Sequence, residues 1–353
     1  MRLRLLAAGA LVLTAAVPPA LGQTGSGIRE LVVPAGVDYT AADGGRIAFD
    51  QYVGLNCDAI TIWSPLAGTR VRIKKTGFCD DDSGETTDLA LAGPRLLWQD
   101  GWSANSYSNY SVFTLDTSKS LDGNKEAPDL FDYEYTHDDY AREDYGPTAG
   151  PFAGHGSLLV FATDYEPKNG PVRNARLWRI DGGRKTLIRR GLDFVALSVD
   201  RNRIAGSASD GPVYLLGADG HTIRTFRPPL RRIRVVTLQG DDLAAAGGGH
   251  VVVFDTRSGH VKASRTLPGE SRFQDYANGL ATLIHGNSIH VLRLSDGRDV
   301  VVARPQGKGV QGESVASEIE PQGLYYTYTT STSCCHTGHV VFVPWKTLQR
   351  LLR

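Results

Sequence analysis

The chain is poor in several features that define common protein classes. Among its 353 residues are 4 cysteines and 1 methionine, and its 38 basic residues balance 38 acidic ones. So few cysteines exclude a small disulfide-dominated scaffold. A net charge of zero gives the whole molecule no electrostatic reason to bind nucleic acid, so we expect no such partner. No strong amphipathic helical pattern is present either, which favours an all-β protein.

The only long apolar run is at the N-terminus. Arg2 and Arg4 precede the apolar segment 5–17, and small residues at 20 and 22 fit a cleavage site. Residues 1–22 are therefore predicted to be a secretory signal peptide, cleaved before Gln23, with a retained membrane anchor as the alternative. We expect residues 23–353 to form a single domain that is secreted or extracytoplasmic, with no membrane span after cleavage.

A strand followed by a polar turn recurs seven times. The seven strands end at Trp63, Leu115, Ile180, Leu216, Phe254, Leu294 and Val343. A tight hairpin precedes each of them, beginning at Asp43, Gly93, Gly154, Asp200, Gly240, Ala277 and Pro321. Glycine and asparagine suit such hairpins because two-residue turns need positive φ. Each unit of roughly 40–50 residues is predicted to be a four-stranded antiparallel blade.

Blade 5, from Val235 to Leu267, has the clearest repeat, and its Phe254-Asp255 pair stands where a Trp-Asp pair often ends a repeat. The chain resembles WD40-like and PQQ-like propeller repeats, although the Gly-His opening of many WD40 repeats is absent. The resemblance implies a seven-bladed β-propeller. We expect a strand at about residues 28–33 to close the ring by joining blade 7, the alternative being a loose leader.

Four long connections distinguish one arc of the ring. They are 100–109 and 116–150 in and after blade 2, 163–174 in blade 3, and 330–337 in blade 7. In a propeller these connections share one face, and long loops on a rigid scaffold often carry function. The long-loop face of blades 7, 1, 2 and 3 is therefore predicted to bind a ligand or protein, with neutral surface decoration as the alternative.

This arc is rich in tyrosine and carboxylate. Residues 116–146 carry ten carboxylates against three basic residues. Such a surface suits a cation, a basic partner or a sugar, and calcium is the first cation to test. The candidate ligand-binding residues are Trp102, Tyr107, Tyr110, Tyr133, Tyr135, His137, Asp138, Asp139 and Tyr140. Asp80, Asp81 and Asp82 are the candidate metal ligands, the alternative being a solvated acidic loop.

The basic residues are concentrated elsewhere. Between Glu166 and Arg234 there are 15 basic and six acidic residues, a net charge of +9. Tyrosines and arginines therefore lie in different blades, whereas a single-stranded nucleic acid site interleaves them. The simpler interpretation is that these arginines protect outer strand edges from pairing with other chains.

The four cysteines all fall on the long-loop face. We predict the disulfides Cys57–Cys79 and Cys334–Cys335, because an exported chain is oxidised. The alternative is a zinc or copper site, since His336 and His339 follow the adjacent cysteines.

Fold alone does not decide the function of a propeller. The leading hypothesis is an extracytoplasmic, monomeric module that is not an enzyme and binds a protein or glycan. The alternative is a secreted enzyme, either a glycan-active lyase or hydrolase or a quinoprotein-like oxidoreductase, that uses His137, Asp138 or Asp139. No catalytic triad, paired carboxylates or phosphate loop is found.

Overall fold

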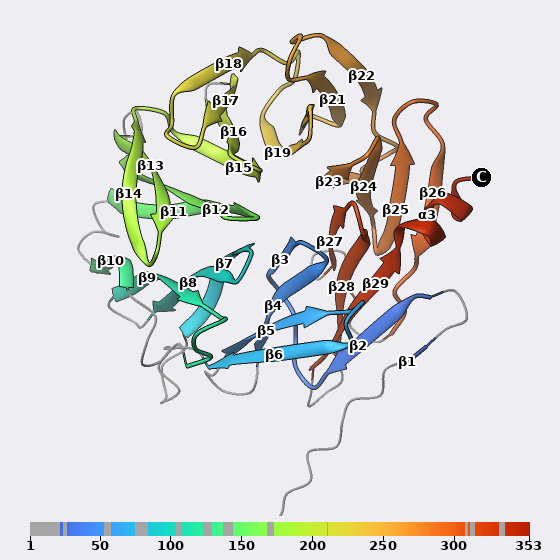
Figure 1. The fold of residues 1–353 in the computed structure, drawn as a ribbon, viewed down its shortest axis with the longest axis horizontal. Coiled ribbons are helices and arrows are strands. Elements are labelled where there is room, and N and C mark those ends of the chain that lie inside the picture. Colours follow the sequence, from blue (N-terminus) through green and yellow to red (C-terminus); the bar gives the residue numbers. More distant parts are fainter. Residues whose placement is uncertain are drawn as a thin grey trace, which may run out of the picture.

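In a computed structural model the chain forms seven antiparallel sheets arranged as a ring (Figure 1). The structure describes residues 22–23, 27–52, 58–74, 84–103, 107–122, 129–136, 144–167, 173–209, 211–307, 310, 315–331 and 336–353. None of the helices in these residues has the length and apolar character needed to cross a membrane. The predicted seven-bladed β-propeller is confirmed, with four strands in each of six sheets and five in the seventh.

The first three blades follow one another along the chain. Blade 1 comprises β3 (Thr40–Asp43), β4 (Arg46–Tyr52), β5 (Asp58–Ser64) and β6 (Thr69–Lys74). Blade 2 comprises β7 (Gly84–Ala92), β8 (Arg95–Ser103), β9 (Tyr107–Asp116) and β10 (Asp129–Thr136). Blade 3 comprises β11 (Asp144–His155), β12 (Leu158–Pro167), β13 (Arg173–Asp181) and β14 (Arg184–Arg190).

The next three blades have shorter strands. Blade 4 comprises β15 (Phe194–Asp200), β16 (Arg203–Ala208), β17 (Val213–Gly217) and β18 (Thr222–Phe226). Blade 5 comprises β19 (Ile233–Gln239), β20 (Asp242–Gly247), β21 (His250–Asp255) and β22 (Val261–Thr266). Blade 6 comprises β23 (Arg272–Ala277), β24 (Leu280–His285), β25 (Ser288–Arg293) and β26 (Asp299–Ala303).

Blade 7 contains strands from both ends of the chain. It comprises β27 (Val315–Glu320), β28 (Gly323–Ser331), β29 (His336–Pro344), β2 (Arg29–Val33) and β1 (Gly22–Gln23). β2 pairs antiparallel with β29, with Leu31 opposite Val340. The helix α3 (Trp345–Leu351) follows and contacts β26, β28 and β29.

The first two strands of every blade are joined by a two-residue turn. The flanking residues pair as Asp43 with Arg46, Ala92 with Arg95, His155 with Leu158, Asp200 with Arg203, Gln239 with Asp242, Ala277 with Leu280 and Glu320 with Gly323. In the first turn Gly44 and Gly45 have φ of 62° and 81°, which other residues rarely adopt. These seven turns surround one end of the central channel.

The hydrophobic core is divided among the junctions between blades. At the junction of blades 7 and 1, for example, Trp63 and Phe49 pack with Tyr325, Phe342 and Leu31. All five side chains are at most 2% exposed. Because a sheet has two faces, each blade is stable only when its neighbours cover both of them, and the ring achieves this without a separate central core.

Arginines of the fourth strands connect neighbouring blades. Each donates hydrogen bonds to carbonyl oxygens in the turn between the third and fourth strands of the next blade. Four junctions have this arrangement: Arg29 with Pro65, Arg189 with Gly220, Arg224 with Arg257 and Ser258, and Arg265 with Leu294 and Ser295. A guanidinium group presents five donors in a plane, so it can bind two carbonyls at once. Two of these arginines belong to the basic stretch 166–234, which therefore has a structural role.

The prediction of long irregular connections was wrong for the described parts of three of the four segments. β8 and β9 continue through most of 100–109, and β12 and β13 through much of 163–174. The segment 116–150 contains the whole of β10 and the first half of β11. The described residues of these segments therefore lengthen the strands of blades 2 and 3, where they extend the antiparallel pairing.

Candidate functional site in the central channel

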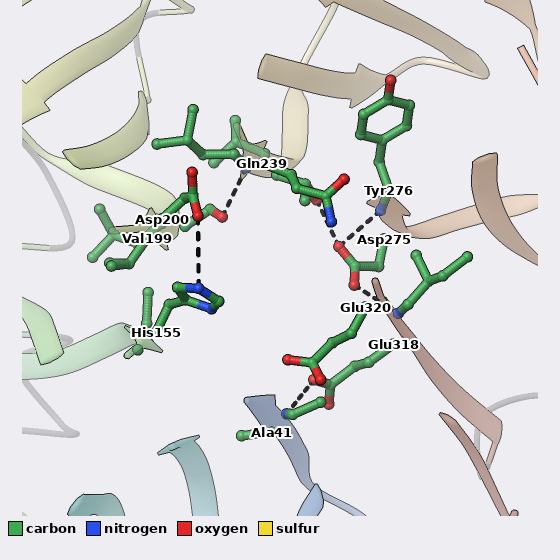
Figure 2. A pocket seen from close by; sticks show the side chains of 18 of the residues that line it. Ala41, His155, Val199, Asp200, Gln239, Asp275, Tyr276, Glu318 and Glu320 are labelled. Atoms are coloured by element: carbon green, nitrogen blue, oxygen red, sulfur yellow. Dashed lines mark hydrogen bonds and ion pairs between the residues drawn. The ribbon is translucent and has the colours of Figure 1, made fainter. Parts of the chain in front are cut away.

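The innermost strands of all seven blades line a central cavity of about 770 Å³. Figure 2 shows five titratable side chains that converge on it from β11, β15, β23 and β27: His155, Asp200, Asp275, Glu318 and Glu320. A volume of this size suits a small molecule, and pockets of this kind combine apolar walls with a few convergent polar groups. Leu197 and Val235 supply half-buried apolar surface to the same lining.

The last residue of each innermost strand forms a ring at the turn end of the channel. In blade order these residues are Asp43, Ala92, His155, Asp200, Gln239, Ala277 and Glu320. Four of the seven are titratable, and three of these four are carboxylic acids. Three polypeptide segments far apart in sequence thus bring negative charge to one small region.

The carboxylates of this ring hold the turns of neighbouring blades. The Glu320 oxygens accept hydrogen bonds from the N–H groups of Gly44 (3.1 Å) and Gly45 (2.9 Å). Asp43 accepts from Gly93 (2.6 Å) and Gly156 (3.0 Å). Asp43 reaches the turns of both blade 2 and blade 3. The Asp200 carboxylate likewise accepts from the Gly240 N–H at 2.8 Å.

A second layer of carboxylates lies two residues earlier on β23 and β27. Glu318 accepts hydrogen bonds from the Thr40 hydroxyl and the Ala42 N–H, both at 2.5 Å. Asp275 accepts from the Ile319 N–H at 2.8 Å and from the Thr237 hydroxyl at 2.9 Å. Each carboxylate therefore connects its own strand with a neighbouring innermost strand.

His155 lies between two carboxylates at the turn end. Its Nδ1 is 3.1 Å from Asp43 Oδ1, and its Nε2 is 3.6 Å from Asp200 Oδ1. The hydrogen bond with Asp43 raises the pKa of His155, and the charges of Asp43, Asp200 and Glu320 add to this against the opposing effect of burial. Burial by itself would raise the pKa of Asp43, but the hydrogen bonds from His155, Gly156 and Gly93 outweigh it and lower the pKa.

The other channel carboxylates have raised pKa values. Burial is the largest cause, and it raises the pKa of Glu318 and Glu320 to about 7 and that of Asp275 to about 6. Desolvation disfavours the charged form of an acid, and neighbouring carboxylates add like-charge repulsion. A cation in the channel would relieve both effects.

Arginines compensate only part of this charge. Arg46 Nη2 is 3.7 Å from Asp43 Oδ2, and Arg203 Nη2 is 3.4 Å from Asp200 Oδ2. Both arginines are the first residue of the second strand of their blade. The equivalent position beside Glu320 is Gly323, which has no side chain. The blade 6 and 7 side of the channel therefore has the larger excess of negative charge.

The residues predicted from sequence lie elsewhere. Trp102 is on β8, Tyr107 and Tyr110 are on β9, and Tyr133 and Tyr135 are on β10, so the structure brings them together in blade 2. Tyr110 is not among the described residues that line the channel. Tyr133 stands opposite Tyr110 in register, and the Tyr110 ring lies against Gly101.

The remaining predicted residues lie outside the described residues. They are the ligand candidates His137, Asp138, Asp139 and Tyr140, the metal candidates Asp80, Asp81 and Asp82, and the cysteines Cys57, Cys79, Cys334 and Cys335. The two disulfides and the alternative metal site at the adjacent cysteines accordingly stay predictions.

The sequence analysis missed the channel residues although it located their hairpins. Asp43, His155 and Asp200 were each part of a recognised turn, and Glu320 immediately precedes one. In four of the seven repeats, the residue immediately before the hairpin turn is titratable. This regularity is visible in the sequence. Aligning the seven hairpins by this position would have placed all four around one channel.

Comparisons with known proteins support the fold. No family model matches the chain, and no curated protein matches it. Among solved structures, a chain of the Mitotic Checkpoint Complex is 12% identical with a TM-score of 0.52, over 96% of this chain and 98% of that one. The WD40 β-propeller domain of Doa1 is 12% identical with a TM-score of 0.50, over 89% and 94%. BamB from Moraxella catarrhalis is 11% identical with a TM-score of 0.45, over 86% and 82%.

At 12% identity, the similarities to the Mitotic Checkpoint Complex chain and to the Doa1 domain show the fold alone, a β-propeller. The class of protein defined here is a β-propeller with an acidic central channel.

Proposed function

We propose that this protein binds a small organic molecule with a positively charged amine in its central channel. The observation that carries the proposal is the convergence of Asp275, Glu318 and Glu320 on a cavity of about 770 Å³. The cavity is larger than a bare ion requires, and its walls include apolar side chains beside the carboxylates. An amine attached to a short apolar chain matches both features.

The electrostatics of the lining favour a cation. Two permanently charged cations also border the cavity, Arg201 and Lys262. Lys262 is already paired with Asp242, and Arg201 is an exposed turn residue. Among the described residues neither cation pairs with Asp275, Glu318 or Glu320, so an ammonium group near these carboxylates would be stabilised by a low surrounding dielectric.

A direct binding measurement tests this proposal. Isothermal titration of the purified chain with spermidine is expected to show binding with a Kd below about 1 mM. The double variant Asp275→Asn/Glu318→Gln should weaken it at least about tenfold, since it removes the central charges. The control Asp219→Asn/Asp296→Asn removes two exposed carboxylates from outer turns and should bind normally. Equal affinity in both variants, or no binding by the wild type, would exclude the proposal.

We further propose that the chain works outside the cytoplasm, because residues 1–22 have the pattern of a signal peptide.

The outer strands of blade 2 are a second candidate surface for a glycan or protein partner. The supporting observation is that Tyr110 and Tyr133 occupy opposite positions on β9 and β10. A glycan array probed with wild-type protein and with Tyr110→Ala/Tyr133→Ala tests the glycan case: signals should be lost in the variant, and a wild type without signals would reject it.

A further inference from the structure

We propose that Asp43, His155 and Glu320 form a binding site for a divalent transition-metal ion at the turn end of the channel. One ligand atom from each residue lies within 4.8 Å of the other two. An ion bound to nitrogen and oxygen at about 2.0–2.2 Å holds its ligands no more than about 4.4 Å apart. Side-chain shifts of a few tenths of an ångström, on the order of ordinary rotamer adjustment, complete the site.

The two carboxylates are already fixed in orientation. Backbone N–H groups of Gly93 and Gly156 hold Asp43, and those of Gly44 and Gly45 hold Glu320. Each carboxylate oxygen can accept about two bonds, so each keeps a lone pair for an ion. Ligands that are oriented in this way by surrounding hydrogen bonds bind metal more tightly than mobile ones.

The second ring nitrogen of His155 faces a third carboxylate at ion-pair distance. Its Nδ1 faces Asp43, and its Nε2 faces Asp200 at 3.6 Å. With Nδ1 on the metal, the Nε2–H would point toward Asp200. A carboxylate that accepts from the second nitrogen of a ligating imidazole is a frequent feature of protein metal sites, because it fixes the ring and increases its basicity.

The local charge favours a divalent ion. Arg46 lies beside Asp43 and Arg203 beside Asp200, whereas Gly323 stands opposite Glu320. Among the described residues Glu320 forms no ion pair with an arginine, so a dication would compensate its charge.

A buried hydroxyl beside the cluster provides an independent observation. Tyr325 is fully buried, and its hydroxyl has no hydrogen-bond partner among the described residues. It stands opposite Glu318 in register, on the face of blade 7 that also carries Glu320. Unpartnered buried hydroxyls are costly. A water molecule held between the metal and this face of blade 7 would give the hydroxyl a partner.

The donor set indicates which ions fit. One imidazole nitrogen and two carboxylates suit manganese, iron, cobalt or zinc. Calcium takes six to eight oxygen ligands and binds imidazole poorly, so it fits this cluster less well. The site therefore differs from the calcium site predicted for Asp80, Asp81 and Asp82.

The metal site rests on the proposed function in one respect, since both occupy the same channel. The two proposals share Glu320, but they are tested on different residues. The variant Asp275→Asn/Glu318→Gln tests amine binding, whereas His155→Ala tests metal binding. Loss of metal binding with retained spermidine binding would therefore overturn this inference alone, and the reverse result would overturn only the amine proposal.

Equilibrium dialysis of the chelator-treated full chain against Co²⁺ tests the site. We expect one Co²⁺ per chain, with a visible absorption band that reports nitrogen and oxygen ligands. His155→Ala and Glu320→Gln should each lower Co²⁺ affinity at least about tenfold. The control His290→Ala removes a histidine that also contacts a carboxylate, Asp299 at 3.1 Å, and should leave Co²⁺ binding unchanged.

Circular dichroism establishes that each variant is folded. Should His155→Ala fail to fold, pulsed electron paramagnetic resonance of wild-type protein with Mn²⁺ replaces it, and coupling to an imidazole nitrogen is expected. The inference is overturned if the wild type binds no Co²⁺ at about 100 μM, if His155→Ala binds it as well as the wild type, or if the nitrogen coupling is absent.

Discussion

At the scale of single residues, the channel carboxylates connect the blades and also make the channel acidic. An innermost strand has no neighbouring strand on its channel side. The backbone N–H groups that point to that side therefore need other acceptors. Glu318 and Asp275 accept such N–H groups from the next innermost strand, and Asp88 accepts one from Phe152 at 3.2 Å. These side chains therefore join the innermost strands of neighbouring blades.

The half-buried Asp88 provides a prediction of how the free energy of unfolding depends on pH. Burial raises the pKa of Asp88 from 3.8 to about 7. The folded state then binds the proton more tightly than the unfolded state. The stabilisation that results from this proton is fully present below pH 4 and is lost as pH rises through 7. Because an amide does not titrate, Asp88→Asn should not lose this stabilisation as pH rises. Between pH 5 and pH 8 the unfolding free energy of the variant should improve relative to wild type by about 2 kcal/mol.

Urea denaturation at pH 5, 6, 7 and 8 measures this difference. The absolute stability of Asp88→Asn is less informative, because the amide also alters the hydrogen bonds with Leu89 and Phe152 at every pH. Asp296→Asn is the matched control: its partner Arg293 lowers the pKa of Asp296 to about 2, so its effect should not vary over this range. A parallel pH dependence for wild type and Asp88→Asn would show that Asp88 is ionised throughout.

At the scale of strands and turns, local signals predicted most elements correctly. The hairpins beginning at Asp43 and Asp200, for example, combine turn residues with an alternating apolar strand, and both features are local. β10 was missed although Asp129–Thr136 also alternates, because its acidic residues resembled a solvated loop. Its pairing with β9 satisfies the backbone, and this tertiary contact is not visible in the segment itself.

The candidate site was harder to predict than the elements that carry it. Asp43, His155 and Glu320 are separated by more than a hundred residues along the chain, and each looks like an ordinary residue beside a turn. Only closure of the ring places them within 4.8 Å of one another. Tyrosines of blade 2 are conspicuous by composition, yet their strands lie on the outer part of the blade, away from the channel.

At the scale of the whole molecule, stability depends on the junctions between blades. Each junction has a buried apolar cluster, and four of them also have an arginine that binds the next blade. Pairing of β2 with β29 joins the two ends of the chain within blade 7. Because the ring is closed, loosening one junction exposes apolar surface on two blades, so unfolding is expected to be cooperative.

The arginine at the junction of blades 4 and 5 provides a test of this view. Arg224 donates to the carbonyl of Arg257 at 2.8 Å and to that of Ser258 at 3.3 Å. Arg224→Ala removes both bonds, and Arg224→Lys keeps the charge but cannot bind two carbonyls in one plane. At about 0.5–1.5 kcal/mol for each hydrogen bond, Arg224→Ala should lower the unfolding free energy by about 1–2 kcal/mol, and Arg224→Lys by nearly as much. Arg227→Ala removes the same charge from an exposed position just beyond β18 and should change stability little.

Urea unfolding of the three variants distinguishes the two explanations of the basic stretch. If the hydrogen-bond geometry matters, Arg224→Lys will lose as much unfolding free energy as Arg224→Ala. If only the charge matters, Arg224→Lys will be as stable as wild type, and Arg227→Ala will be as destabilised as Arg224→Ala.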